Sequence, residues 1–179
     1  MRSRRGVAGA GGIILSVSCL SLAGCGGGSG SYGQATSMTC VPYARAVSGL
    51  PLQGDAWQWW RAAQGRYAEA STPAPGSVLV FRRTGRLPSG HLAVVSNVVS
   101  GRKVIVTQAN WVPYRITDNQ PVMDVSPGND WSAVRVWWPP SHAWGVTVYT
   151  TYGFIQPRPA GLQNAPIAQV SESGLRVGS

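Results

Sequence analysis

The spacing of hydrophobic and polar positions changes part-way along the chain. Apolar residues recur at helical spacing over Cys40–Val47, and Pro42 suits the first turn of a helix. Asp55 is a suitable cap for a second helix over Ala56–Ala63, which is expected to end near Gly65. The first part of the folded region is therefore predicted to be helical.

The pattern from Ser77 onward is typical of strands. Short apolar runs alternate with turn residues, and no helical spacing is visible. Helices followed by an antiparallel sheet indicate an α+β fold. The expected strands are Ser77–Arg82, Leu92–Val99, Lys103–Ala109 and Ala133–Trp138, with one or two more within Gly145–Ile155.

The predicted hairpin brings three polar residues together. If Ser100 and Gly101 form a two-residue turn, His91 falls opposite Asn110, and Gln108 shares their face one diagonal away. An imidazole beside a side-chain amide is held in one tautomer, which suits a catalytic base. A slip of one residue would place His91 and Asn110 on opposite faces.

The N-terminus has the layout of a signal peptide. Residues 1–5 are basic, residues 6–22 are apolar, and Leu22-Ala23-Gly24-Cys25 resembles a bacterial lipobox. We therefore expect residues 1–24 to be removed, lipid to be attached to Cys25, and residues 25–35 to form a flexible tether. The alternative is an uncleaved anchor, although a Gly-rich apolar segment of 17 residues is short for a membrane span.

If the protein is exported, each of its three cysteines has a different expected role. Cys19 lies in the signal segment and Cys25 is the expected lipid site, so Cys40 has no disulfide partner. It is either a small buried hydrophobe or a functional thiol. Its position at the start of a helix favours the thiolate, which is the nucleophilic form.

Composition narrows the class of partner. The chain carries 15 Lys and Arg against 6 Asp and Glu, which fits either an anionic partner or a merely soluble basic surface. No basic run is interleaved with aromatic residues, so no nucleic-acid partner is expected. Residues 36–156 are predicted to form the one catalytic domain, and residues 157–179 a disordered tail.

Several segments together resemble the CHAP domain (cysteine, histidine-dependent amidohydrolase/peptidase), over about residues 36–140. The resemblance implies a papain-like α+β fold, in which N-terminal helices carrying the cysteine pack on an antiparallel β-sheet. It also implies that Cys40 is the nucleophile, His91 the base and Asn110 the residue that orients the imidazole. The matching segments are Cys40–Arg45, Gly54–Ala56, Trp59-Trp60, Pro75–Phe81, Gly90–Val95 and Gln108–Trp111.

One position departs from the family pattern. Some members have Glu two residues before the Asn, where this chain has Gln108, so which amide orients His91 stays open. Some members bind calcium through an acidic loop before the cysteine, but Ser29–Thr39 has no acidic residue, so no metal or other cofactor is expected. Trp111 is a candidate wall of the substrate cleft, with a core role as the alternative.

The resemblance implies peptidoglycan as the substrate, cut at the N-acetylmuramoyl-L-alanine amide or within the peptide stem. The alternatives are a catalytically inactive cell-wall-binding lipoprotein and another papain-like enzyme, such as an acyltransferase. The expected location is the bacterial envelope, through the N-terminal lipid. Gly26, which follows the lipid site, favours the periplasmic side of an outer membrane where the host has one.

Overall fold

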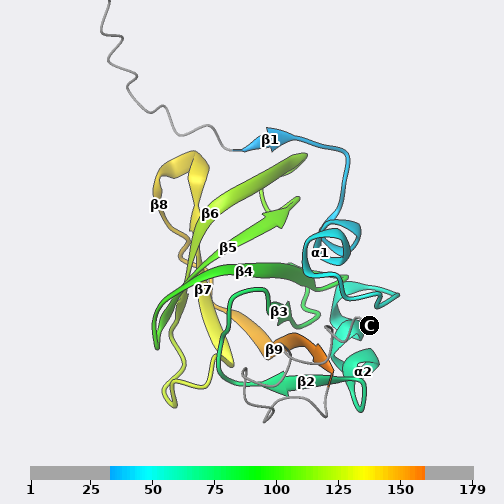
Figure 1. Ribbon diagram of the computed structural model, residues 1–179. Helices are drawn as coiled ribbons and strands as arrows, with labels where there is room; N and C mark the ends of the chain where they lie inside the picture. The colour runs from blue at the N-terminus through cyan, green and yellow to red at the C-terminus, as the bar shows by residue number, and fades with distance from the viewer. Residues whose placement is uncertain (1–32, 160–179) are drawn as a thin grey trace, which may run out of the picture.

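Six antiparallel strands close into a barrel in the computed structural model, which describes residues 33–159. Neighbouring strands pair around the ring, and pairing between the two end strands closes it (Figure 1). Around the ring, the strands are β6 (Arg115–Asp124), β5 (Lys103–Ala109), β4 (His91–Ser100), β3 (Val78–Phe81), β9 (Tyr149–Pro159) and β7 (Ala133–Trp138).

Three short strands extend this ring. Strand β1 (Gln34–Ala35) pairs with β6, β2 (Tyr67–Ala70) pairs with β9, and β8 (Ala143–Trp144) pairs with β7. Strand β9 continues to Pro159, three residues beyond the predicted end of the catalytic domain. The predicted signal peptide, Cys25, and residues 160–179 of the predicted tail lie outside the described residues.

The predicted papain-like α+β fold is wrong. Strands account for 43% of the structure, and the α-helices of residues 33–159 are two short ones, α1 (Cys40–Ser48) and α2 (Trp59–Ala63). Among the six barrel strands, the one that the sequence pattern did not predict is β6, which has a polar run at residues 117–120 followed by Pro121. Asp, Asn and Pro are depleted in strands. Because β6 pairs with both β5 and β7, missing it leaves an open sheet in place of a barrel.

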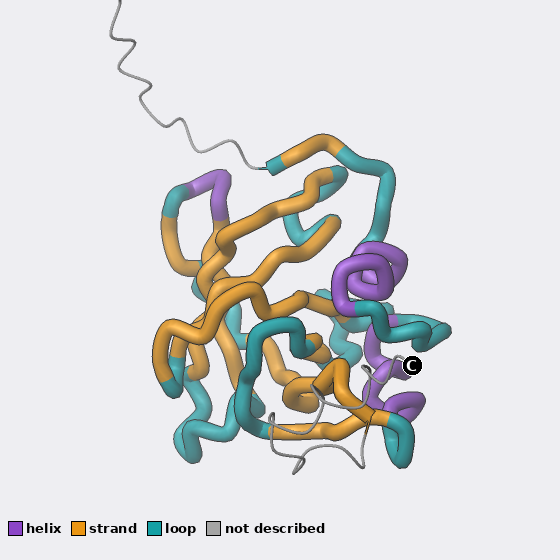
Figure 2. Tube along the Cα trace, in the orientation of Figure 1, coloured by secondary structure: helices purple, strands orange, loops and turns teal. Residues whose placement is uncertain are grey.

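The helices form where the spacing predicts them. Helix α1 ends at Gly49, whose φ of 71° is left-handed and whose N–H donates to the Arg45 carbonyl at 3.0 Å. The second predicted helix begins with one 3₁₀ turn, Ala56–Gln58, and continues as α2. The backbone N–H of Asp55 donates to the Gln58 side chain at 2.8 Å, which forms a capping box. Figure 2 shows α1 and α2 on the same side of the barrel.

Two apolar clusters share the strands β3 and β4. Successive side chains of a strand point to opposite faces, so an all-apolar strand serves both clusters. One cluster packs α1 and α2 on the outside of the barrel, and the other fills its interior. The outer face carries Val78, Val80, Leu92 and Val94, and the inner face carries Leu79, Phe81, Ala93 and Val95.

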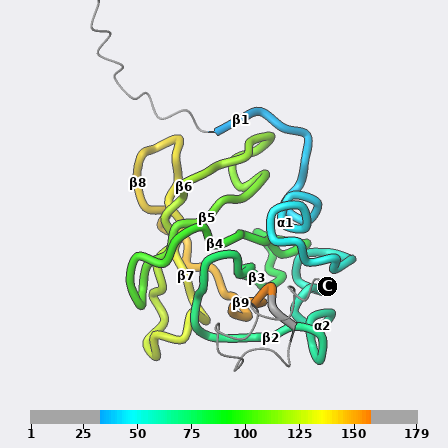
Figure 3. The backbone as a smooth tube through the Cα atoms, viewed as in Figure 1, coloured from blue at the N-terminus to red at the C-terminus, as the bar shows by residue number. Residues whose placement is uncertain are grey.

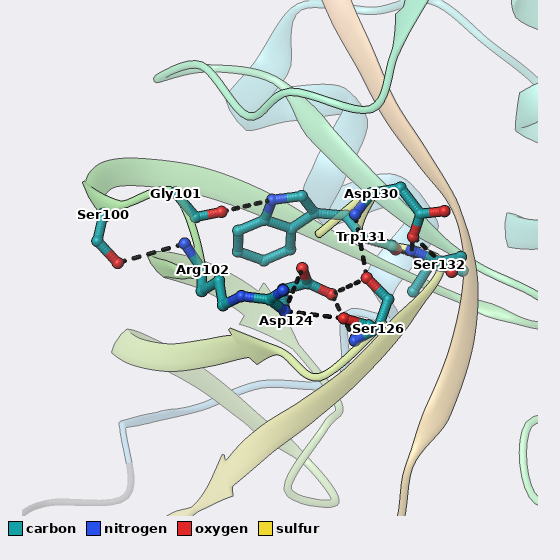
Figure 4. Close-up of polar contacts among 9 residues, drawn as sticks. Ser100, Gly101, Arg102, Asp124, Ser126, Asp130, Trp131 and Ser132 are labelled. Carbon is teal, nitrogen blue, oxygen red and sulfur yellow. Dashed lines mark hydrogen bonds and ion pairs between the residues drawn. The ribbon is translucent and has the colours of Figure 1, made fainter. Parts of the chain in front are cut away.

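A polar network, drawn in Figure 4, holds the barrel end at which β4 turns into β5. Arg102, in the turn between β4 and β5, forms an ion pair with the buried Asp124 at 3.2 Å and donates to the Ser126 carbonyl at 2.8 Å. The buried Trp131 donates from Nε1 to the Gly101 carbonyl at 3.1 Å. These bonds join the β4–β5 turn to the β6–β7 loop.

The opposite barrel end gathers the candidate residues. In an antiparallel ring, β3, β5 and β7 end where β4, β6 and β9 begin. We call this end the site end. It contains Phe81, His91, Trp111, Trp138 and Tyr149, which lie at or beside the ends of their strands.

Candidate active site

Cys40 is the first residue of α1 and is half-buried beside the outer face of β4. Burial raises the pKa of the Cys40 thiol, and this effect outweighs the backbone N–H groups of Leu92, Cys40 and Val41, which lower the pKa. The helix start therefore does not by itself produce a resting thiolate, which differs from the expectation drawn from position alone.

His91 is the first residue of β4 and is buried, with 4% of its surface exposed. Its ring lies against Phe81 at 5.5 Å and Trp111 at 5.0 Å between ring centres. This burial lowers the pKa of His91 to about 4, against a hydrogen bond with Gln108 that raises it. The imidazole is therefore neutral near pH 7, as a general base must be.

Gln108 is the side chain that hydrogen-bonds to the imidazole. Its Oε1 lies 2.9 Å from His91 Nε2, and because an amide oxygen only accepts, Nε2 carries the hydrogen. The other ring nitrogen, Nδ1, then has the free lone pair. Alternate residues of a strand point to the same face. His91 is two residues before Ala93 and Gln108 two residues after Val106, and both of these side chains face the barrel interior, so His91 and Gln108 lie on the inner face as well.

Asn110 lies elsewhere in this arrangement. Its side chain is exposed, its φ is 62°, and its Oδ1 accepts a hydrogen bond from the Tyr114 N–H at 3.0 Å. Its backbone N–H donates to the Arg115 carbonyl at 2.7 Å. The structure thus brings Gln108, rather than Asn110, to His91 and uses the Asn110 side chain to form the β5–β6 turn.

Cys40, His91 and Asn110 line one open cleft of about 550 Å³. The remaining walls come from residues 54–56 and from the loop at residues 86–90, which leads into β4. Gly90 in this loop has a φ of 70°, and a Cβ there would lie 2.8 Å from the Phe81 carbonyl oxygen. Only glycine lets this loop approach β3 closely enough to start β4 at His91.

Arg86 and Asp55 also line this cleft, although the sequence pattern indicated no cleft role for either residue. Asp55 was expected as a helix cap and as part of a segment that resembles the CHAP domain, and Arg86 lies in a loop with no recognisable motif. Their charges are exposed and opposite in sign. The cleft can therefore accept a ligand that carries both a carboxylate and an ammonium group.

A hydrogen-bonded chain joins α1 to the barrel wall. The Tyr43 hydroxyl bonds with the Thr107 hydroxyl, which in turn bonds with Asp118. Thr107 directly precedes Gln108 on β5, so this chain ties the helix that carries Cys40 to the strand that carries Gln108. No spacing in the sequence pointed to it, because it depends on the unpredicted strand β6.

Trp111 lies behind the imidazole and does not line the cleft that contains Cys40. Its half-buried ring contacts His91 and Tyr149, each at 5.0 Å between ring centres, and lines a separate cavity.

Among residues 33–159, no group of three or more His, Cys, Asp or Glu side chains has the arrangement of a metal site. No helix in the same range has both the length and the apolar composition of a membrane span.

Residues 29–110 match the family model of the CHAP domain. This segment of the chain is therefore similar to the CHAP family. The match includes Cys40, His91 and Gln108 and ends at Asn110, so β6 to β9 lie beyond it. The CHAP family is associated with hydrolases, and its implied substrate is peptidoglycan. No curated protein matches the chain.

Proposed function

We propose that this CHAP-like domain is a thiol hydrolase that cleaves an amide bond of peptidoglycan. Cys40 is the nucleophile, His91 the general base and Gln108 the residue that orients the imidazole. The observation that supports this most is the 2.9 Å hydrogen bond between His91 Nε2 and Gln108 Oε1, at the edge of a cleft that Cys40 also lines. A nucleophile, a base and a group that orients the base are the parts that acyl transfer needs.

The reaction begins from a neutral pair. His91 Nδ1 takes the proton of the Cys40 thiol, and the sulfur attacks the amide carbonyl to form a C–S bond. The tetrahedral oxyanion lies near the backbone N–H groups of Cys40 and Val41 at the start of α1, and one such donor lowers the barrier by about 3 kcal/mol.

Collapse of this intermediate breaks the C–N bond, and His91 gives its Nδ1 proton to the leaving amine. Water, deprotonated by the same nitrogen, then attacks the thioester. The C–S bond breaks, the acid is released, and His91 returns the proton to the Cys40 sulfur. The hydrogen bond from His91 Nε2 to Gln108 persists through both acylation and deacylation, which keeps Nδ1 directed at the reacting atoms.

The charges of the cleft fit a peptide stem. Arg86 and Asp55 lie on its walls and can pair with the carboxylate and ammonium groups of a short cell-wall peptide. Both candidate bonds, the muramoyl–alanine amide and an amide within the stem, present such a peptide to the cleft.

Digestion of purified peptidoglycan by the full chain, followed by mass spectrometry of the products, tests the proposal. The expected products carry new amine ends, and both Cys40→Ala and His91→Ala should abolish their release. His142→Ala is the matched control, because the chain has two histidines and His142 lies outside the cleft.

Three outcomes would contradict the proposal. If Cys40→Ala released the products as fully as the wild type, Cys40 would not be the nucleophile. Binding of peptidoglycan by the wild type with no product would favour the inactive wall-binding protein. A new cross-link in place of a new amine end would favour an acyltransferase.

A further inference from the structure

A second cavity, of about 480 Å³, opens at the site end of the barrel. We call it the aromatic cavity. It is as large as many sites for small ligands, which range over about 300–1,000 Å³. Its lining residues within the described chain include no charged side chain. Four aromatic rings contribute to its walls, together with two hydroxyl side chains: Trp111, Trp138, Trp144, Tyr149, Ser141 and Thr147.

The aromatic walls are held in place by the strands. Trp144 of β8 pairs with Trp137 of β7, and their rings meet edge to face at 5.7 Å. The turn after β8 is fixed by two bonds at Gly145, whose N–H donates to the Val136 carbonyl at 3.0 Å and whose carbonyl accepts from Arg135 Nε at 2.8 Å. The cavity is therefore preformed and does not need a ligand to shape it.

The aromatic cavity adjoins the base of the candidate active site. Trp111 lines the cavity, and its ring centre lies 5.0 Å from that of His91. Asn110, the preceding residue, lines the cleft that contains Cys40. The two spaces therefore meet at the contact between His91 and Trp111, and a polymer lying in the cleft can reach the aromatic cavity. In Figure 3, β8 and α1 lie on opposite sides of β5 and β6, so such a polymer would cross the site end.

We propose that the aromatic cavity binds a neutral N-acetylated sugar ring of the glycan strand whose peptide is cut, an inference that rests on the proposed function. Tryptophan and tyrosine rings offer an apolar face to the C–H groups of a sugar, while hydroxyl and backbone groups at the wall bond its oxygens. The uncharged lining disfavours the ionised groups of a peptide stem, which suit Arg86 and Asp55 in the cleft instead. Peptide and glycan therefore occupy different spaces on either side of Trp111.

Titration of the full-length Cys40→Ala protein with the trimer of β-1,4-linked N-acetylglucosamine tests the proposal without catalysis. Saturable binding is expected by calorimetry, and Trp144→Ala should weaken it at least tenfold. Trp60→Ala is the matched control, since it removes a half-buried tryptophan that stacks on Tyr152 outside the cavity and should leave the affinity unchanged.

A second variant covers the case in which Trp144→Ala does not fold. Ala143 is exposed and lines the cavity, so Ala143→Phe fills the space without removing a core side chain and should also abolish binding. Equal affinity in Ala143→Phe, or no saturable binding to the wild-type cavity, would overturn the proposal.

Vesicles of phosphatidylglycerol provide the competing ligand, because the rim residue Val146 is 87% exposed. Binding to vesicles but not to the trimer would assign the cavity to a lipid surface and overturn the sugar assignment. If the trimer does not bind but Cys40→Ala still abolishes peptidoglycan cleavage, the hydrolase proposal stands and this inference alone fails.

Discussion

Replacing Gln108 by glutamate isolates the part that this side chain plays in holding the imidazole. Gln108 is fully buried, its Oε1 bonds with His91, and its amide nitrogen has no hydrogen-bond partner within the described chain. Glutamate keeps the accepting oxygen and the length of the side chain, removes the unpaired N–H group, and adds a negative charge beside the ring. The substitution therefore changes charge with little change in shape.

The size of the effect follows from the geometry. Burial holds the pKa of His91 at about 4, and a carboxylate at hydrogen-bond distance favours the imidazolium. An opposite charge this close raises a pKa by about 1–3 units, each worth about 1.4 kcal/mol, so Gln108→Glu should bring the pKa of His91 to about 5–7. Asn110→Gly is the matched control, because the Asn110 oxygen bonds with Tyr114 and glycine accepts the positive φ.

Proton NMR of the imidazoles gives the measurement. The Cys40→Ala background removes the coupled titration of the thiol, and the two histidines of the chain give two titration curves, which His142→Gln assigns. The reasoning fails if His91 titrates at the same pH with and without the Gln108→Glu substitution. It fails equally if Asn110→Gly produces the larger shift, since Asn110 would then be the orienting residue.

Two further predictions concern stability. The pKa of His91 is about 4 in the folded protein and 6.5 ordinarily, so between these values the unfolded chain binds more protons than the folded one. The free energy of unfolding should therefore fall as pH drops from 6.5 to 4, by about 3 kcal/mol from this residue. Urea denaturation measures this dependence on pH, and His91→Gln should flatten it. Asp124→Ala removes the buried partner of Arg102 and the hydrogen-bond acceptor for Ser126. It should lower the free energy of unfolding, measured in urea, by about 2–4 kcal/mol, while cleavage by the folded protein persists. A loss below about 0.5 kcal/mol would contradict a stabilising role of the network.

The helices and most strands could be predicted because each depends on local spacing. Strand Ala133–Trp138 lies where the apolar pattern places it, and α1 begins at Cys40 as expected. The closure of the sheet could not be predicted, because it depends on β6. That strand is stabilised by pairing with two neighbours, a tertiary effect that outweighs the low strand preference of Asp118 and Asn119.

The β4–β5 pairing agrees with the predicted alignment at Val94 and Val95, although the turn that was used to predict it lies elsewhere. The turn is one residue farther along than expected, since Ser100 pairs with Lys103. Two irregularities then shift β4 against β5, and from Val95 onward the pairing returns to the predicted alignment. The alignment brings His91 to Gln108, whereas Asn110 lies past the end of β5, where the turn determines its direction.

The position of β9 has a consequence for when the thiol can become active. Strand β3, which leads into the loop before His91, lies between β4 and β9, and β9 is the last strand of the described chain. The barrel thus stays open until residues 149–159 are available, although Cys40, His91 and Gln108 all precede residue 110. A nascent chain that ends before β9 carries every candidate catalytic group without the walls that bury and align them. Completion of the C-terminal strand is therefore required before the closed barrel can hold these three groups in place.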